Sequence, residues 1–461
     1  MKINLLFSLS VCLLLTSSLT TPATSSGKLL REHQNRTASI ITPEFTLEGV
    51  SNDNTWSNDG KFLATSTYKT AHIWDATTGT LSFSLSRFAD DVNHISWSPG
   101  GQYIATSGYR NDAVLWDAIT RDSLFTTATI REVYEISNLS WSPDSTRIAI
   151  GALNGNAYIY DIKSHQQIFV LKGHSNSLNK VAWSPDSKKL ATCSWDKTVI
   201  IWDCSTGTKN TTLIGHTSNV KNACWSPNGK QIVTASMDNT AIIWNSISGN
   251  IVSTLKGHTG YVMNALWSPD GKLIATASAD STAILWDASK GTKLQKFTGH
   301  NDWISSICWS PDSKKIATAS YDRTAIVWDV TTGTQLNVLS GHTKIIQNIF
   351  WSKDGTRIAT SSNDNTTKIW HIAGAVSAVQ EQATDRSGID FAPNPVRDDA
   401  VLRFSPLPYA SSILVFSIMG QQIFDYPVPA GESSAVLPMN ELPKGIYLLR
   451  WNTTTTSISK W

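Results

Sequence analysis

The sequence predicts an all-β protein in which eight repeated four-stranded sheets stack around a ring, followed by a small β-sandwich. The first observation is a series of aromatic residues that end aliphatic runs at intervals of 42 or 44 residues: Trp74, Trp116, Tyr160, Trp202, Trp244, Trp286, Trp328 and Trp370. A second series runs out of phase with the first: Trp56, Trp97, Trp141, Trp183, Trp225, Trp267, Trp309 and Trp351. Self-similarity at a fixed period indicates one supersecondary unit that is stacked many times.

The composition fits a large folded core and argues against polyanionic partners. The chain has 461 residues, of which 41% are hydrophobic and 16% are charged, and its formal net charge is +2. No strong positive field therefore steers nucleic acid or acidic lipid to the surface. We expect no nucleic-acid partner.

The N-terminus has the pattern of a secretory signal peptide. Lys2 precedes an apolar stretch from residue 5 to residue 15, which is too short to span a bilayer, and small and polar residues follow. We expect residues 1–23 to be removed and the mature chain to contain no transmembrane segment. A buried strand or short helix is the alternative interpretation.

Residues 211–249 show how each repeat is expected to fold. Four short β-prone runs, at 211–214, 220–225, 231–236 and 241–244, are separated by turn residues, a pattern typical of a four-stranded antiparallel sheet. The first turn reads SPNG here and SPGG, SPDS, SPDG or SKDG in other units. Proline suits its first central position, and glycine suits a backbone conformation closed to other residues. Because a single sheet has two apolar faces, we expect the sheets to cover one another radially.

Residues 44–380 resemble the WD40 repeat family. The fourth to eighth units each contain a Gly-His pair, a Ser-x-Asp motif and a tryptophan six residues after the aspartate: His174, Ser194, Asp196, Trp202; His216, Ser236, Asp238, Trp244; His258, Ser278, Asp280, Trp286; His300, Ser320, Asp322, Trp328; His342, Ser362, Asp364, Trp370. The resemblance implies a β-propeller, and the eight aromatic residues imply eight blades. Seven blades, with the first unit displaced, is the alternative. The resemblance also implies that an N-terminal strand, here residues 44–48, completes the last blade.

Histidine, aspartate and serine at fixed spacing also suggest nucleophilic catalysis. The resemblance instead implies a structural network in which the aspartate accepts a hydrogen bond from the histidine, while serine and tryptophan orient the histidine. Five copies in one ring favour this structural role. The first three units have no Gly-His pair and carry Lys69, Arg110 and Asn154 at the aspartate position. We therefore expect these units to open more easily.

The resemblance places partner binding on the rim formed by the loops before the first strand and between the second and third strands. These positions are the least repeated part of the chain, and the expected binding residues are Trp195, Trp303, Tyr261, Met263, Tyr321, Met237, Ile345, Tyr109 and Tyr68. Trp195 and Trp303 are the propeller tryptophans outside the two series. Aromatic side chains provide much contact area at a small entropic cost. Cover for neighbouring blades is the alternative role.

The sequence contains no motif for a cofactor, a metal or a catalytic nucleophile. P-loop, HExxH and GxSxG motifs are absent, and no CxxC pair occurs. We expect no cofactor, no metal and no enzymatic activity. The competing hypothesis is an extracellular propeller enzyme that acts on glycans or peptides through acidic residues at the axis.

The repeat ends after Trp370. Residues 381–390 have the composition of a linker, and residues 391–461 predict a small β-sandwich with Pro and Gly turns. The segments PNPV at 393–396, FSIMGQQI at 416–423 and LPKGIYLLR at 442–450 resemble the C-terminal sorting domain of the bacterial type IX secretion system. Its last strand carries a single basic residue, Lys460, where such domains often end on a basic strand. A generic accessory sandwich is the alternative.

These features together predict a bacterial protein that passes through the periplasm to the cell surface or the medium. Its C-terminal domain would engage the secretion machinery and then be removed. Its propeller would be a rigid scaffold for a protein or peptide partner. A scaffold that is not exported is a third hypothesis.

Overall fold

The computed structural model describes residues 38–49, 53–86, 91–108, 113–127, 136–372, 390–392, 400–403, 411–417, 422–430, 434–437, 445–451 and 454–460. Contacts divide the chain into two compact units, residues 1–372 and 373–461. Within the described residues the long elements are all β-strands, and no helix is long and apolar enough to cross a membrane. The predicted signal peptide lies outside the described residues.

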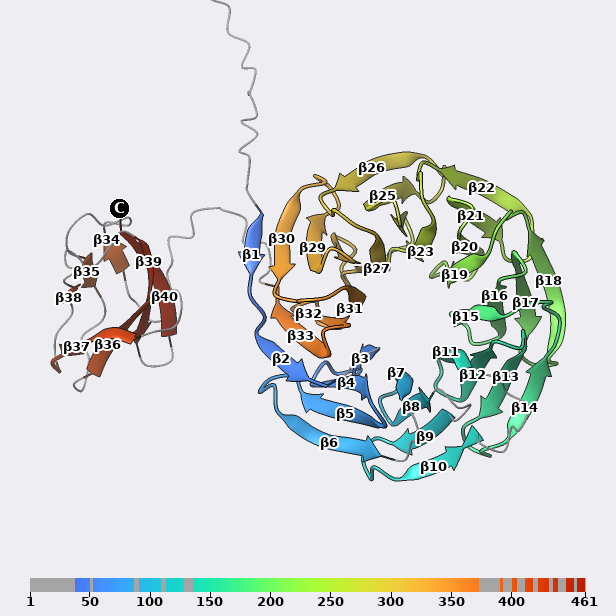
Figure 1. Ribbon diagram of the computed structural model, residues 1–461, viewed down its shortest axis with the longest axis horizontal. Helices are drawn as coiled ribbons and strands as arrows, with labels where there is room; N and C mark the ends of the chain where they lie inside the picture. Colours follow the sequence, from blue (N-terminus) through green and yellow to red (C-terminus); the bar gives the residue numbers. More distant parts are fainter. Residues whose placement is uncertain are drawn as a thin grey trace, which may run out of the picture. The chain divides into compact units, whose positions relative to one another are not determined.

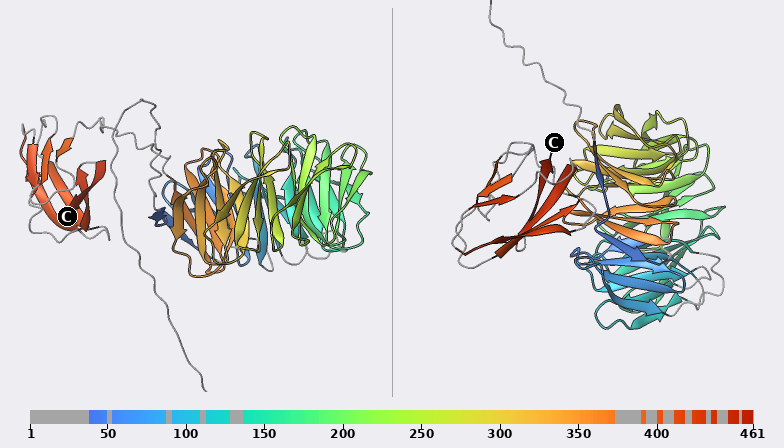
Figure 2. Two further views of the ribbon diagram at one scale, coloured as in Figure 1. Left: turned by 90° about the horizontal axis from the view of Figure 1, so that it is seen from above. Right: turned by 60° about the vertical axis from the view of Figure 1, so that its left-hand side comes forward.

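The first unit is a propeller of eight antiparallel blades around a central channel (Figure 1). The first strand of each blade lies at the channel and the fourth at the outside, and the strands run between the two faces of the disc (Figure 2). Blades 1 to 4 comprise β3 (Asn54–Trp56), β4 (Phe62–Thr67), β5 (Thr70–Asp75), β6 (Leu81–Ser86); β7 (Val92–Trp97), β8 (Tyr103–Gly108), β9 (Ala113–Asp117), β10 (Ser123–Thr126); β11 (Ile136–Trp141), β12 (Arg147–Ala152), β13 (Ala157–Asp161), β14 (Gln167–Leu171); and β15 (Leu178–Trp183), β16 (Lys189–Ser194), β17 (Thr198–Asp203), β18 (Thr208–Ile214).

Blades 5 to 8 repeat the same order. They comprise β19 (Val220–Trp225), β20 (Gln231–Ser236), β21 (Thr240–Asn245), β22 (Ile251–Lys256); β23 (Val262–Trp267), β24 (Leu273–Ser278), β25 (Thr282–Asp287), β26 (Lys293–Thr298); β27 (Ile304–Trp309), β28 (Lys315–Ser320), β29 (Thr324–Asp329), β30 (Gln335–Ser340); and β31 (Ile346–Trp351), β32 (Arg357–Ser362), β33 (Thr366–His371), with β2 (Phe45–Glu48). The prediction of eight blades is confirmed, and the seven-bladed alternative is wrong.

The N-terminal segment closes the ring, as the sequence predicts. Strand β2 pairs antiparallel with β33, in a register that places Phe45 opposite Ile369. An ion pair between Glu44 and Arg357, 3.0 Å from Oε2 to Nε, lies beside this pairing. Strand β1 (Ser39–Ile41) adds an element that the sequence did not predict, because it pairs in parallel with β30 as a fifth strand of blade 7.

The two tryptophan series have different structural tasks. In five blades a tryptophan of the first strand donates through Nε1 to a backbone carbonyl in the preceding blade, as Trp183 does to Ser140 (3.0 Å) and Trp225 to Ala182 (2.9 Å). Trp56 makes the same bond to Phe350, which joins blade 1 to blade 8. The third-strand tryptophans pack into apolar clusters formed by adjacent blades. The core of this unit therefore lies between blades, because each sheet buries its faces against its neighbours.

The turn between the first and second strands corrects one expectation. Gly229, Gly271 and Gly355 adopt the positive φ, but Ser145, Ser187 and Ser313 adopt it equally, with φ near 60°. This conformation is therefore not closed to other residues. The first serine of each turn stabilises it, since Ser184 Oγ donates to Asp186 Oδ1 and accepts from the Lys189 amide.

The second unit contains two antiparallel sheets, as the predicted sandwich requires. One sheet comprises β34 (Asp390–Ala392), β35 (Ala400–Arg403) and β38 (Ser434–Leu437). The other comprises β37 (Gln422–Val428), β36 (Ser411–Ser417), β39 (Gly445–Trp451) and β40 (Thr454–Lys460). Ile413 and Val415 are fully buried in it. The PNPV motif and the linker segment 381–389 lie outside the described residues.

Candidate functional site

In blades 4 to 8 a buried histidine contacts an aspartate of the following strand connection. The distances from histidine Nδ1 to aspartate Oδ2 are 2.7, 2.7, 3.0, 2.8 and 2.8 Å for the pairs His174–Asp196, His216–Asp238, His258–Asp280, His300–Asp322 and His342–Asp364. Each aspartate also accepts from the backbone amide that follows the histidine and from a nearby threonine hydroxyl, as Asp280 does from Thr259 and Thr282. The aspartate therefore ties the loop before the blade to the connection between its second and third strands.

A threonine, rather than the expected serine, bonds the second ring nitrogen of the histidine. In blade 5, His216 Nε2 lies 2.7 Å from Thr234 Oγ1, and Trp244 Nε1 donates to the same hydroxyl at 2.8 Å. The equivalent residues in the other four blades are Thr192, Thr276, Thr318 and Thr360. The expected role of the serine is thus corrected, whereas the tryptophan acts through the threonine and meets the histidine ring edge-on at 6.2 Å in blades 5 and 8. The signal was in the sequence, because each Ser-x-Asp motif is part of a longer Thr-x-Ser-x-Asp.

The serine of the Ser-x-Asp motif forms hydrogen bonds with backbone groups. Ser236 Oγ donates to the Ser218 carbonyl at 3.1 Å and accepts from the Asp238 amide at 3.1 Å. Neither contact involves a histidine, so the serine is not placed as a nucleophile activated by an imidazole base. This geometry supports a structural network.

Burial and hydrogen bonding shift the pKa of each network residue in opposite directions. Burial lowers the pKa of His174 and His342, and the neighbouring aspartates oppose that shift only in part. Burial alone would raise the pKa of Asp364, but bonds from the Thr366 hydroxyl, the Thr343 amide and His342 outweigh it and hold the pKa at about 2. A neutral histidine donates from Nδ1 to the aspartate and accepts at Nε2 from the threonine hydroxyl.

Blades 1 to 3 keep only parts of this network. In blades 1 and 2 the third-strand tryptophans still donate to a threonine, with Trp74 2.9 Å from Thr65 and Trp116 2.8 Å from Thr106. In blade 3 Asn154 takes the aspartate position and donates to Tyr158 Oη at 2.9 Å. Lys69 takes that position in blade 1, and Arg110 lies outside the described residues.

The rim brings together three of the predicted binding residues. Trp303 stacks on Tyr321 with ring centroids 5.8 Å apart at 24°, and Tyr261 meets the Trp303 ring edge-on at 6.5 Å. Tyr261 and Trp303 are 40% and 42% exposed, which leaves much of their surface open to a partner. These three residues, from blades 6 and 7, form what we call the rim triad.

The other predicted rim residues are spread over other blades. Trp195, in blade 4, is 45% exposed, and its Nε1 donates to Asn179 Oδ1 at 2.7 Å. Tyr68 is exposed beneath the Lys69 ammonium, which lies 5.1 Å from the ring centroid. Met237, Met263 and Ile345 are half-buried, and Tyr109 lies outside the described residues.

Comparisons with known proteins agree with this architecture. The family model described as WD domain, G-beta repeat matches residues 207–245, 249–287, 291–329 and 333–371, and the model described as WDR19 first beta-propeller matches residues 52–224. The chain belongs to the WD40-repeat propeller family. The model described as secretion system C-terminal sorting domain matches residues 391–461. The protein is therefore exported by type IX secretion, to the cell surface or the medium.

A solved structure shows the same fold. The WD40 propeller is similar to the crystal structure of the C-terminal WD40 domain of Sif2, with 20% identity and a TM-score of 0.66 over 73% of this chain and 100% of that chain. At this identity the likeness concerns the fold alone. A comparison with curated proteins gives no match.

The WD40 propeller also has a polar ring in its channel that sequence reasoning missed. The channel contains two cavities, and one residue per blade, three positions before each first-strand tryptophan, lines at least one of them. These residues are Asp53, His94, Asn138, Lys180, Asn222, Asn264, Ser306 and Asn348. Asn222 Nδ2 donates to Asn264 Oδ1 at 2.9 Å, and Asn264 Nδ2 donates to the Ser305 carbonyl at 3.0 Å. Reading that single register position around the ring would have found it.

Proposed function

We propose that this exported WD40 protein is a binding scaffold that captures a protein or peptide on its rim. The observation that carries the proposal is the rim triad, in which the Trp303 ring contacts both tyrosine rings and two of the three residues are more than a third exposed. Aromatic side chains dominate the energetics of protein interfaces, because they bury a large area with few rotatable bonds. Exposed aromatic clusters of this kind usually mark interaction sites.

The backbone under the triad is rigidly held, which lowers the entropic cost of binding. The Tyr321 amide donates to the Trp303 carbonyl at 2.9 Å, and the Ala279 amide donates to the Tyr261 carbonyl at 2.9 Å. The Trp303 amide is bonded to Asp302 Oδ1 at 2.7 Å. The His300–Asp322 pair links the same two loops of blade 7. The triad is therefore presented on a preorganised surface.

The remaining parts of the proposal concern the extent of the surface and the export route. Trp195, Met237, Met263, Ile345, Tyr68 and Tyr109 would extend the binding rim. The N-terminal residues 1–23 would direct the chain to the periplasm of a bacterium, and the C-terminal domain, residues 391–461, would then engage the secretion machinery. Residues 44–380 would form the propeller and residues 381–390 the linker.

The competing enzymatic hypothesis receives less support from the channel. Glycoside hydrolysis ordinarily requires two carboxylates that flank the scissile bond. The polar ring contains one carboxylate, Asp53, whose Oδ2 lies 3.6 Å from His94 Nδ1. Among the described residues, no group of three or more His, Cys, Asp or Glu side chains could hold a metal. These observations favour the binding role that we propose.

Capture by the secreted protein tests the scaffold proposal. Immobilised full-length protein is incubated with culture supernatant, and bound proteins are identified by mass spectrometry and then titrated individually. We expect Trp303→Ala with Tyr321→Ala to weaken the binding of a captured partner at least ten-fold, about 1.4 kcal/mol. Leu294→Ala is the matched control, because Leu294 is 51% exposed on an outer strand away from the rim. Equal binding by both variants would show that the triad only covers neighbouring loops.

A further inference from the structure

The channel of the propeller contains a cavity that is lined by both apolar and polar side chains. It has a volume of about 510 Å³, within the range of small-molecule sites. Its wall is largely apolar and includes Leu266, Ile307 and Phe350. The polar ring supplies Lys180, Asn222, Asn264, Ser306 and Asn348 to the same cavity. An apolar cavity with a few convergent polar groups is the usual form of a ligand site.

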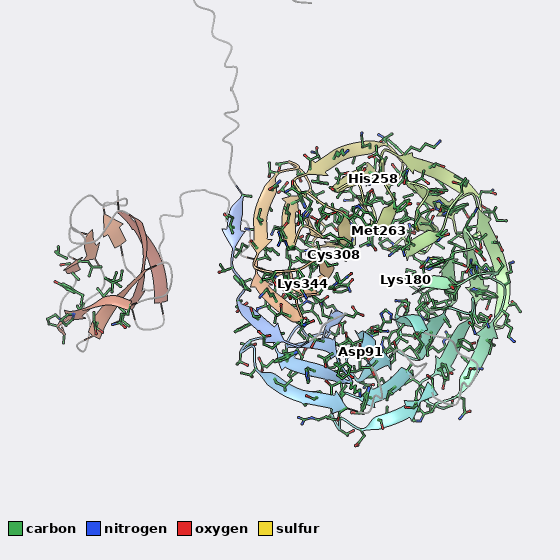
Figure 3. The ribbon with its side chains drawn as sticks, in the orientation of Figure 1. Asp91, Lys180, His258, Met263, Cys308 and Lys344 are labelled. Carbon is green, nitrogen blue, oxygen red and sulfur yellow. The ribbon has the colours of Figure 1, made fainter. Side chains whose placement is uncertain are left out.

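Lys180 is the cation of this cavity. It projects from β15 at the wall of the channel (Figure 3), and it lines both the 510 Å³ cavity and a neighbouring cavity of about 280 Å³. Within the described part of the chain, its ammonium makes no hydrogen bond or ion pair. Asp53 lines the smaller cavity, but its Oδ2 lies 3.6 Å from His94 and its Oδ1 lies 3.5 Å from Asn348 Nδ2. A half-buried ammonium without a partner favours an anion as its ligand.

The neutral members of the ring compete little with Lys180 for an anion. The Nδ2 groups of Asn222 and Asn264 already donate to the next blade, and Asn348 Nδ2 is directed to Asp53. Each of these amides donates one of its N–H groups within the ring, and the Lys180 ammonium is the one charged donor among the residues that line this cavity. The site therefore suits one anionic group rather than several.

Phe350 provides the second half of the site. It stands one position before the tryptophan of its first strand, where the other blades carry Thr55, Ser96, Ser140, Ala182, Cys224, Leu266 and Cys308. Its side chain is 37% exposed although it lines the channel rather than the outer surface. A large ring left exposed in a cavity favours an apolar ligand surface against it.

We propose that the channel binds a small carboxylate with an apolar body, its carboxylate against Lys180 Nζ and its body against Phe350 and Leu266. The site is separate from the rim triad and does not depend on a protein partner. Lys221, one blade further on, lines a cavity at the channel mouth together with Trp195 and His94. Burial lowers the pKa of Lys221, whose ammonium also makes no ion pair among the described residues. A second cation at the mouth would attract the same anions.

Calorimetric titration of the full-length protein tests the proposal with free acids and their neutral amides. We expect phenylacetate and hexanoate to bind with one site per chain, and phenylacetamide, hexanamide and acetate to bind at least roughly ten-fold more weakly. Lys180→Met keeps the aliphatic stem but removes the charge and should weaken phenylacetate binding at least roughly ten-fold, whereas Lys180→Arg should restore most of it. Phe350→Ala should weaken both acids by a similar factor.

Lys272→Met is the matched control, because the Lys272 side chain is 80% exposed in the turn between β23 and β24 and does not line the cavity. It should bind phenylacetate as the unaltered protein does, and thermal unfolding should show that all variants are folded. Acid and amide binding equally well would overturn the proposal, as would equal losses in Lys180→Met and Lys272→Met. So would the absence of binding by either acid at concentrations up to about 10 mM. Binding of a peptide with one internal aspartate, without binding of the free acids, would assign the site to a partner's side chain and also overturn it.

Discussion

Blades 1 to 3 and blades 4 to 8 have the same strand topology but differ in the hydrogen bonds that hold their loops. Both groups are built on four antiparallel strands per blade, with apolar clusters between neighbours. Blades 4 to 8 each add a buried histidine–aspartate pair, whereas blade 1 has Lys69 and blade 3 has Asn154 at the aspartate position. Since the ring closes without these pairs in the first blades, strand pairing and apolar packing are sufficient for the fold. The histidine–aspartate pairs stabilise individual loops on a fold that is already specified.

Among the tests of this comparison, removal of one aspartate should cause the largest loss in the free energy of unfolding. Asp280→Ala leaves His258 and the amides of Thr259 and Thr282 without their acceptor in blade 6. We expect a loss of about 3 kcal/mol in the free energy of unfolding, because buried donors are left unsatisfied. Asn154→Ala in blade 3 removes one side-chain bond to Tyr158 and one to the Asn156 amide and should cost about 1 kcal/mol. Urea unfolding monitored by tryptophan fluorescence measures both; equal losses would contradict the distinction between the two groups.

Amide hydrogen exchange should show the same distinction without mutation. We expect amides of β5, β9 and β13 to exchange roughly 30-fold faster than the equivalent amides of β21, β25 and β29. This ratio corresponds to about 2 kcal/mol less protection against local opening. The comparison is read by mass spectrometry of peptides from each third strand. Equal protection in the two groups would mean that inter-blade packing alone sets local stability.

Acidification should reduce the stability that the histidine–aspartate pairs add to blades 4 to 8. Near neutral pH this is the smallest of the expected effects. Folding lowers the pKa of His174 and His342 below 6.5, so their contribution is complete above pH 6.5 and decreases as the pH falls below it. Folding also lowers the pKa of Asp364 from 3.8 to about 2, so its contribution is complete above pH 3.8 and is lost as the pH falls toward 2.

Urea unfolding of the unaltered protein and of Asp280→Ala between pH 7 and pH 2 measures this effect. Burial would raise the pKa of Asp280, but hydrogen bonds from His258, Thr282 and the Thr259 amide outweigh it and hold the pKa well below 3.8. The two unfolding midpoints should therefore approach each other as the pH falls below 3.8, where the Asp280 carboxylate becomes protonated. Asn154→Ala serves as the control, since Asn154 does not titrate, and its difference from the unaltered protein should stay constant. A constant difference for Asp280→Ala as well would contradict the assigned network.

Much of the fold could be predicted because the repeat appears five times with nearly the same residues. The period locates the strands, the aromatic count predicts eight blades, and residues 44–48 match the outer-strand pattern that closes blade 8. Strand β1 was missed because Ser39–Ile41 is a short segment whose pairing with β30 lies about 300 residues away in sequence. Local patterns contain no information on such a contact.

The candidate sites were less predictable than the fold. Register identified Tyr261, Trp303 and Tyr321 as rim residues, but only the structure shows that these three touch while Trp195 lies in another blade. Thr234 was overlooked because a threonine in a β-strand is unremarkable in the sequence, although its hydroxyl joins His216 to Trp244. Lys180 was overlooked for a similar reason, since a lone lysine ordinarily indicates a solvated surface.

By itself the sequence determined the number of blades, the position of the repeated strands and the register of the histidine–aspartate pairs. These depend on periodicity, which is a local property repeated along the chain. The tertiary structure decided which side chains meet across blades: the rim triad, the polar ring and the cavity between Lys180 and Phe350. Ring closure places residues from distant blades around one axis, so their contacts depend on the summed rotation of eight sheets and not on any segment alone.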